Sequence, residues 1–129
     1  MPARLRPASY AEVHEALAAD PRGAEQTRLL VKHFLAVLAE RSPGASVEVR
    51  VPPYAAVQAV AGVRHTRGTP PAVVELDADT WIALAVGELL WVDAESDGRV
   101  RASGERADLS PLLPLLPDLP VLPAPEEDS

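Results

Sequence analysis

The sequence contains no cysteine. Disulfide bonds, thiolate metal sites and cysteine nucleophiles are therefore excluded, and stability must come from ordinary packing. Long apolar runs are also missing: none reaches the roughly 18 to 20 residues that span a bilayer. The first residues lack the apolar stretch of a signal peptide. We therefore expect a cytoplasmic protein with no stable membrane insertion.

Positive charge is scarce and unevenly distributed. Residues 1–74 carry nine Lys and Arg against six Asp and Glu, whereas residues 75–129 carry three against thirteen. The two parts therefore have formal charges of +3 and −10. Nucleic-acid binding depends on dense Lys and Arg that displace counterions from the phosphate backbone. We therefore expect no nucleic-acid partner.

Motifs that carry catalysis are missing as well. The three histidines, His14, His33 and His65, are too scattered for the short spacings of a zinc site. There is no GxSxG nucleophile elbow and no glycine-rich phosphate loop. The sequence therefore predicts no catalytic residue, no metal and no cofactor, and indicates that the protein is not an enzyme.

The composition is that of a globular protein. The 129 residues are 47% hydrophobic and 24% charged, which suits one core in a single domain over residues 1–129. Within it we distinguish N-terminal helices (1–44), a sheet with central helices (45–110) and a proline-rich C-terminal segment (111–129).

The first part of the chain shows helical periodicity. A capping-box pattern from Ser9 to Glu12 precedes a short amphipathic helix that Asp20-Pro21 ends. An apolar stripe then predicts a long helix from about Gly23 to Arg41.

The next segments read as strands. Valines 47, 49 and 51 alternate with Glu48 and Arg50, which is typical of a half-buried strand. Residues 54–60 read as its hairpin partner, and residues 72–76 as a further strand.

Helices and one more strand are expected after residue 76. Asp77 looks like an N-cap and Gly87 like a helix end, so the apolar run 81–86 is interpreted as a helix. A short helix follows at 90–95, then a strand at 99–103 and the start of a final helix at Asp108. The order is that of an α+β fold.

The C-terminal segment is rich in proline and leucine. Six of the fourteen prolines lie between residues 111 and 125, a density that prevents a long regular helix. The leucines between these prolines predict that the segment packs back over the domain's own apolar surface. The alternative, left open, is a partner-recognition peptide.

Residues 77–116 carry a pattern of short motifs. They are Gly87-Glu88-Leu89, Ala94, Asp97-Gly98-Arg99-Val100, Ser103-Gly104 and Ala107-Asp108-Leu109-Ser110, after a helix that contains Trp81. This pattern resembles the C-terminal half of the sterol carrier protein family. The stretch from Val47 to Leu116 resembles stand-alone sterol-carrier-like domains of actinobacteria, which are related to the accessory domain of mycothiol-dependent maleylpyruvate isomerases.

The resemblance implies a twisted sheet of about five strands with helices packed on one face, enclosing an apolar cavity for lipids or acyl chains. The chain departs from that pattern where the proline-rich segment replaces the last helix. It also departs at its end, which reads Glu-Asp-Ser and not a Ser-Lys-Leu type peroxisomal address.

Two groups of residues are candidate ligand-binding sites. The first is an apolar wall of Trp81, Leu84, Ala85, Leu89 and Trp91, in which small and large side chains together leave room for a cavity. The alternative is that these residues simply form a core helix.

The second group is the loop that contains Arg64, His65 and Arg67. Arginine pairs recognise carboxylate or phosphate through bidentate hydrogen bonds, so this loop is a candidate site for an anionic head group. The alternative is that both arginines pair with Glu75, Asp77 or Asp79 and only order the loop.

The leading hypothesis is a non-catalytic carrier of an apolar ligand, such as a lipid, fatty acid or acyl thioester. The competing hypothesis is a protein-interaction or homodimerisation module, which would act through the sheet and the proline-rich segment, or as an accessory to a thiol-dependent enzyme. A carrier needs an internal volume of several hundred Å³, whereas an assembly module needs an exposed apolar patch.

Overall fold

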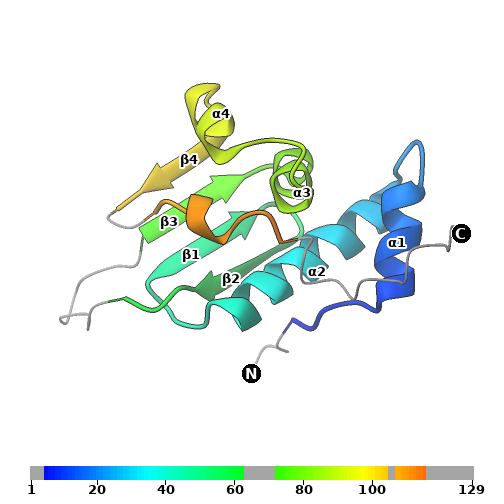
Figure 1. The fold of residues 1–129 in the computed structure, drawn as a ribbon, viewed down its shortest axis with the longest axis horizontal. Coiled ribbons are helices and arrows are strands. Elements are labelled where there is room, and N and C mark those ends of the chain that lie inside the picture. Colours follow the sequence, from blue (N-terminus) through cyan, green and yellow to red (C-terminus); the bar gives the residue numbers. More distant parts are fainter. Residues whose placement is uncertain (1–4, 63–71, 105–106, 116–129) are drawn as a thin grey trace, which may run out of the picture.

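The computed structural model describes residues 5–62, 72–104 and 107–115. Two helices come first, α1 (Tyr10–Ala18) and α2 (Ala24–Arg41), and three strands follow, β1 (Val47–Val51), β2 (Ala55–Ala59) and β3 (Ala72–Leu76). The chain continues with α3 (Ala78–Val86), α4 (Trp91–Ser96), β4 (Val100–Ser103) and a short 3-10 turn, η1 (Ser110–Leu112). In Figure 1 the long helix α2 lies between α1 and the sheet. The predicted order of helices and strands is therefore confirmed as far as β4.

The capping box predicted for α1 is present. The Ser9 hydroxyl accepts a hydrogen bond from the Glu12 backbone N–H at 3.2 Å, and Glu12 Oε1 accepts one from the Ser9 N–H at 3.0 Å. The Ser9 N–H and the Ser9 hydroxyl, which also donates to Glu12 Oε1, lower the pKa of Glu12, because both hydrogen bonds favour its ionised form. The start of α1 is thus fixed by local chemistry that the sequence already displays.

The sheet has the strand order β2-β1-β3-β4. Strand β1 is antiparallel to β2 and parallel to β3, and β4 is antiparallel to β3. The expectation of about five strands is corrected here, since within the described ranges the sheet has four. The four strands are those that the residue pattern itself predicted; the fifth was implied only by the resemblance.

The two faces of the sheet differ in polarity. Val47, Val49 and Val51 have no exposed surface and point toward the helices. On the other face Arg50 lies opposite Glu75 in the neighbouring strand, and Glu75 lies opposite Arg101. Opposite charges facing each other across strands suit a solvated surface. The helices therefore cover one face of the sheet.

Helix α3 has the predicted ends. Asp77 Oδ1 accepts a hydrogen bond from the Thr80 N–H at 2.8 Å, and Gly87 ends the helix in the left-handed region with φ of 86°. Burial acts to raise the pKa of Asp77, but the Thr80 hydrogen bonds and nearby Arg99 outweigh it and lower that pKa.

The segment Ala107–Leu115, called the strap below, replaces the expected final helix by the single turn η1. Leu109 and Leu115 are both fully buried. The Leu115 N–H donates to the Ala85 carbonyl of α3 at 2.7 Å, and the Arg41 guanidinium of α2 donates to the carbonyls of Pro114 and Leu115 at 3.2 and 3.1 Å. The described part of the proline-rich segment therefore packs back on the domain.

Buried side chains of the sheet and of the helices pack together. Phe34, Leu38 and Trp81 have no exposed surface and belong to one continuous hydrophobic core. The internal tunnel that the resemblance implies stays a prediction.

Candidate apolar binding site

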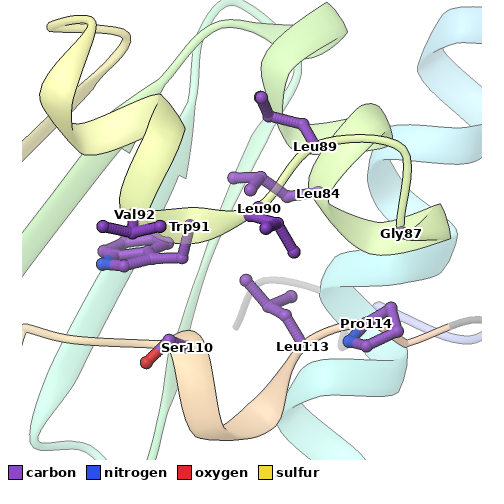
Figure 2. A pocket seen from close by; sticks show the side chains of 9 residues that line it. All are labelled: Leu84, Gly87, Leu89, Leu90, Trp91, Val92, Ser110, Leu113 and Pro114. Carbon is purple, nitrogen blue, oxygen red and sulfur yellow. The ribbon is translucent and has the colours of Figure 1, made fainter.

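An open apolar hollow of about 220 Å³ lies between the α3–α4 segment and the strap. One wall comes from α3, α4 and their connection, and the other from the strap, as Figure 2 shows. In that view Leu113 extends toward Leu90 from the opposite side. The lining residues are Leu84, Gly87, Leu89, Leu90, Trp91, Val92, Ser110, Leu113 and Pro114.

Three residues of the predicted apolar wall line this hollow: Leu84, Leu89 and Trp91. The other two do not. Trp81 and Ala85 have no exposed surface and belong to the core, which matches the alternative reading of a core helix for these two positions.

The two tryptophans differ in their hydrogen bonding. Trp81 Nε1 donates to the Val31 carbonyl at 3.3 Å, whereas the buried Nε1 of Trp91 has no partner among the described residues. An unpaired buried N–H costs roughly 1 to 3 kcal/mol. The packing of Trp91 in the wall is therefore not accompanied by a hydrogen bond from its indole N–H to another described residue.

Sequence reasoning missed the residues at the mouth of the hollow. Leu90 and Val92 are 63% and 61% exposed and are called the lip below. They flank Trp91, the first residue of a helix of six residues, which is too short for periodicity to show which side faces water. Leu113 and Pro114 complete the site from a distant part of the sequence, and the only signal for them was the prediction that the proline-rich segment folds back.

Two larger hollows are lined by charged side chains. One, of about 420 Å³, includes Glu75, Asp77, Arg99 and Arg101 at the sheet edge. The other, of about 690 Å³, lies along α1 and the start of α2. Pockets that hold small ligands are mostly apolar with a few polar groups, so the smaller apolar hollow is the better candidate.

The predicted anion site at Arg64, His65 and Arg67 lies outside the described residues. Of the acidic residues named as alternative partners, Glu75 is opposite Arg50 and Arg101 in the sheet. Asp77 caps α3. The role of the three loop residues stays a prediction.

Within residues 5–62, 72–104 and 107–115, no group of three or more His, Asp or Glu is placed to hold a metal ion. His33 is buried and its Nδ1 accepts a hydrogen bond from the Ala8 N–H at 3.0 Å. Burial lowers the pKa of His33, because the charged ring is poorly solvated there. His33 is therefore part of the packed interior and is bonded to the backbone before α1.

None of the described helices combines the length and apolar character required to cross a bilayer.

The sequence matches the family model described as bacterial SCP ortholog over residues 23–115. The match covers 93 of the 129 residues and runs from α2 to the strap, so it includes every element that forms the hollow. No curated protein matches the chain. The resemblance seen in the motifs from Gly87 to Ser110 is thereby confirmed, and the chain belongs to the sterol carrier protein-like family of bacterial SCP orthologs.

Proposed function

We propose that the protein is a non-catalytic carrier that binds an apolar chain in the hollow between the α3–α4 segment and the strap. The observation that carries this proposal is the apolar lining formed by Leu84, Leu89, Trp91 and Leu113. Membership of a sterol carrier protein-like family supports a lipid-carrier type of role.

The size of the hollow bears on the kind of ligand. Its volume of about 220 Å³ is below the roughly 300 to 1,000 Å³ of typical small-molecule pockets. A single alkyl or acyl chain can enter such a space and continue along the exposed Leu90 and Val92 lip. A rigid polycyclic ligand would need the strap to move away. The proposal is therefore an acyl or alkyl chain, carried in the cytoplasm without chemical change.

The lip permits a test that leaves the core intact. Because Leu90 and Val92 are largely exposed, L90E/V92E should fold, but it places two carboxylates at the mouth of the hollow. We expect binding of a neutral alkyl ligand, measured by tryptophan fluorescence, to weaken at least about tenfold, which corresponds to about 1.4 kcal/mol.

The matched control is A56E/Q58E. Ala56 and Gln58 are exposed on β2, so this variant gains the same number of carboxylates away from the hollow. Native mass spectrometry of the purified wild-type protein should show a co-purified lipid or acyl compound. If neither method detects any apolar ligand, the carrier function is wrong.

A second candidate function is self-association through the lip. The observation that favours it is that two large apolar side chains, two residues apart in the sequence, are both exposed. Sedimentation of the wild type and of L90E/V92E separates the two functions. A dimer that dissociates in the variant, without ligand binding in either protein, would support an interaction module.

A further inference from the structure

The hollow is bordered by negative charge. The α3–α4 stretch from Leu84 to Gly98 contains four acidic residues and no Lys or Arg, and the strap contains one more acid and again no Lys or Arg. The five acidic side chains are all exposed. They are Glu88, Asp93, Glu95, Asp97 and Asp108.

Three of these acids are attached directly to the lining. Glu88 lies between Gly87 and Leu89, and Asp93 follows Val92. Asp108 Oδ1 accepts a hydrogen bond from the backbone N–H of Ser110, a lining residue, at 2.9 Å. Neither Glu88 nor Asp93 forms an ion pair with another residue of the described part of the chain. Within the described residues, neither charge is paired with a cation.

Among the described residues, Arg41 is bonded to the strap but does not reach the lip. Arg41 reaches the hollow at Pro114, where its guanidinium donates to two strap carbonyls. It lies at the end of the strap that contacts α2 and α3, whereas the lip formed by Leu90 and Val92 lies at the start of α4. The exposed acids Glu88 and Asp93 lie within two residues of the lip in the sequence, so a ligand head at the lip is close to the segment that carries them.

Building on the proposed carrier function, we propose that the hollow selects amphiphiles with a cationic head group, such as an alkylammonium, over fatty acids of the same chain length. The alkyl chain occupies the apolar hollow, and the head remains in water beside Glu88, Asp93 and Asp108. Because like charges repel, the same carboxylates disfavour an anionic head. A surface lined by one sign of charge concentrates counter-ions by about tenfold or more at low ionic strength.

The test compares ligands that differ only in their heads. Dodecyltrimethylammonium, dodecanol and dodecanoate are titrated below their aggregation concentrations, with tryptophan fluorescence as the signal. We expect the cation to bind about tenfold more tightly than the anion in about 0.01 M salt, with the alcohol between them. In about 1 M salt, where the screening length falls to about 3 Å, the difference should largely disappear.

A matched pair of variants assigns the effect to these residues. E88Q/D93N/D108N removes three charges at the hollow, and the amide that replaces the Asp108 carboxylate keeps an oxygen that can accept from Ser110. E15Q/D20N/E25Q removes three charges at exposed positions of α1, of the connection between α1 and α2, and of α2. The first variant should lose the preference for the cation, and the second should keep it.

The possible results separate this inference from the carrier function. Equal binding of all three ligands would overturn the head-group preference and leave the carrier function standing. Tighter binding of dodecanoate that R64A/R67A abolishes would overturn it in favour of the anion site predicted at Arg64 and Arg67. If none of the three ligands binds, the carrier function itself fails.

Discussion

Trp81 and Trp91 lie close together in the sequence, but their surroundings differ. Trp81 is fully buried, with its indole N–H bonded to Val31. Trp91 is 6% exposed, lines the hollow and leaves its N–H unpaired among the described residues. We therefore expect Trp91 to report ligand binding and Trp81 to be silent. An alkyl ligand should change the emission of W81F, in which Trp91 is the only fluorophore of this kind, and should leave W91F unchanged.

The same two variants should differ in stability. Trp81→Phe loses a hydrogen bond as well as buried volume, whereas Trp91→Phe also removes a buried unpaired donor, which offsets part of the lost packing. We expect W81F to reduce the free energy of unfolding by about 1 kcal/mol or more beyond W91F. Urea denaturation measures the free energy of unfolding of each variant. Equal losses would indicate that the Trp91 N–H has a partner in solution.

His33 should make stability dependent on pH. Burial lowers the pKa of His33 below its ordinary value of 6.5, so the unfolded chain takes up the proton first as the pH falls. Stability from the neutral ring is complete above about pH 6.5 and is lost as the pH drops from there toward the lower folded pKa. The slope is at most about 1.4 kcal/mol per pH unit for one proton.

The contribution of His33 can be isolated with His33→Gln, which retains a side-chain acceptor for Ala8. Between about pH 7.5 and 5.5, this variant should lose less stability than the wild type. His14→Gln, at an exposed ring on α1, serves as the control and should follow the wild type. A wild-type slope in the His33 variant would show that other groups produce the pH dependence.

The positions of several helices and strands could be predicted from the sequence, because they depend on interactions between residues that are close together in the chain. The caps at Ser9 and Asp77 and the valine alternation of β1 depend on neighbours within four residues, and each element lies where those signals placed it. The hollow could not be predicted in this way. It needs Leu90 and Leu113 to face each other, and the strap holds Leu113 there through contacts with α2 and α3.

We expect the strap to increase the free energy of unfolding. Leu109 and Leu115 are fully buried at its two ends, and a buried leucine contributes about 1.5 to 3 kcal/mol. Truncation after Ser110 removes Leu115 and the Arg41 hydrogen bonds, so we expect a loss of at least about 2 kcal/mol and new binding of an apolar dye. Truncation after Leu115 keeps these contacts and is the matched control. Thermal denaturation compares the two proteins with the full chain.

The two truncations also test the prediction that the segment up to Pro123 folds back. A loss that occurs only in the shorter protein would limit docking to the strap. A further loss in the longer one would extend it beyond Leu115. If neither protein loses stability, the strap does not dock, and the partner-peptide alternative explains its leucines better.

For the molecule as a whole, ligand binding and folding must be linked. A ligand that binds only the folded protein raises the free energy of unfolding by about 2.7 kcal/mol at one hundred times its dissociation constant. Because the hollow is formed jointly by α3, α4 and the strap, it exists only when these parts are assembled. Saturation with dodecanol should therefore raise the melting temperature of the wild type by several degrees.

This shift can show where the ligand binds. If the ligand occupies the hollow, L90E/V92E should show a much smaller shift, and A56E/Q58E should shift as the wild type does. An equal shift in all three proteins would place the ligand elsewhere, in a tunnel between the sheet and the helices. The side chains around such a tunnel would include Phe34 and Trp81, which are fully buried in the core. In that case the emission of Trp81, and not that of Trp91, should follow the titration.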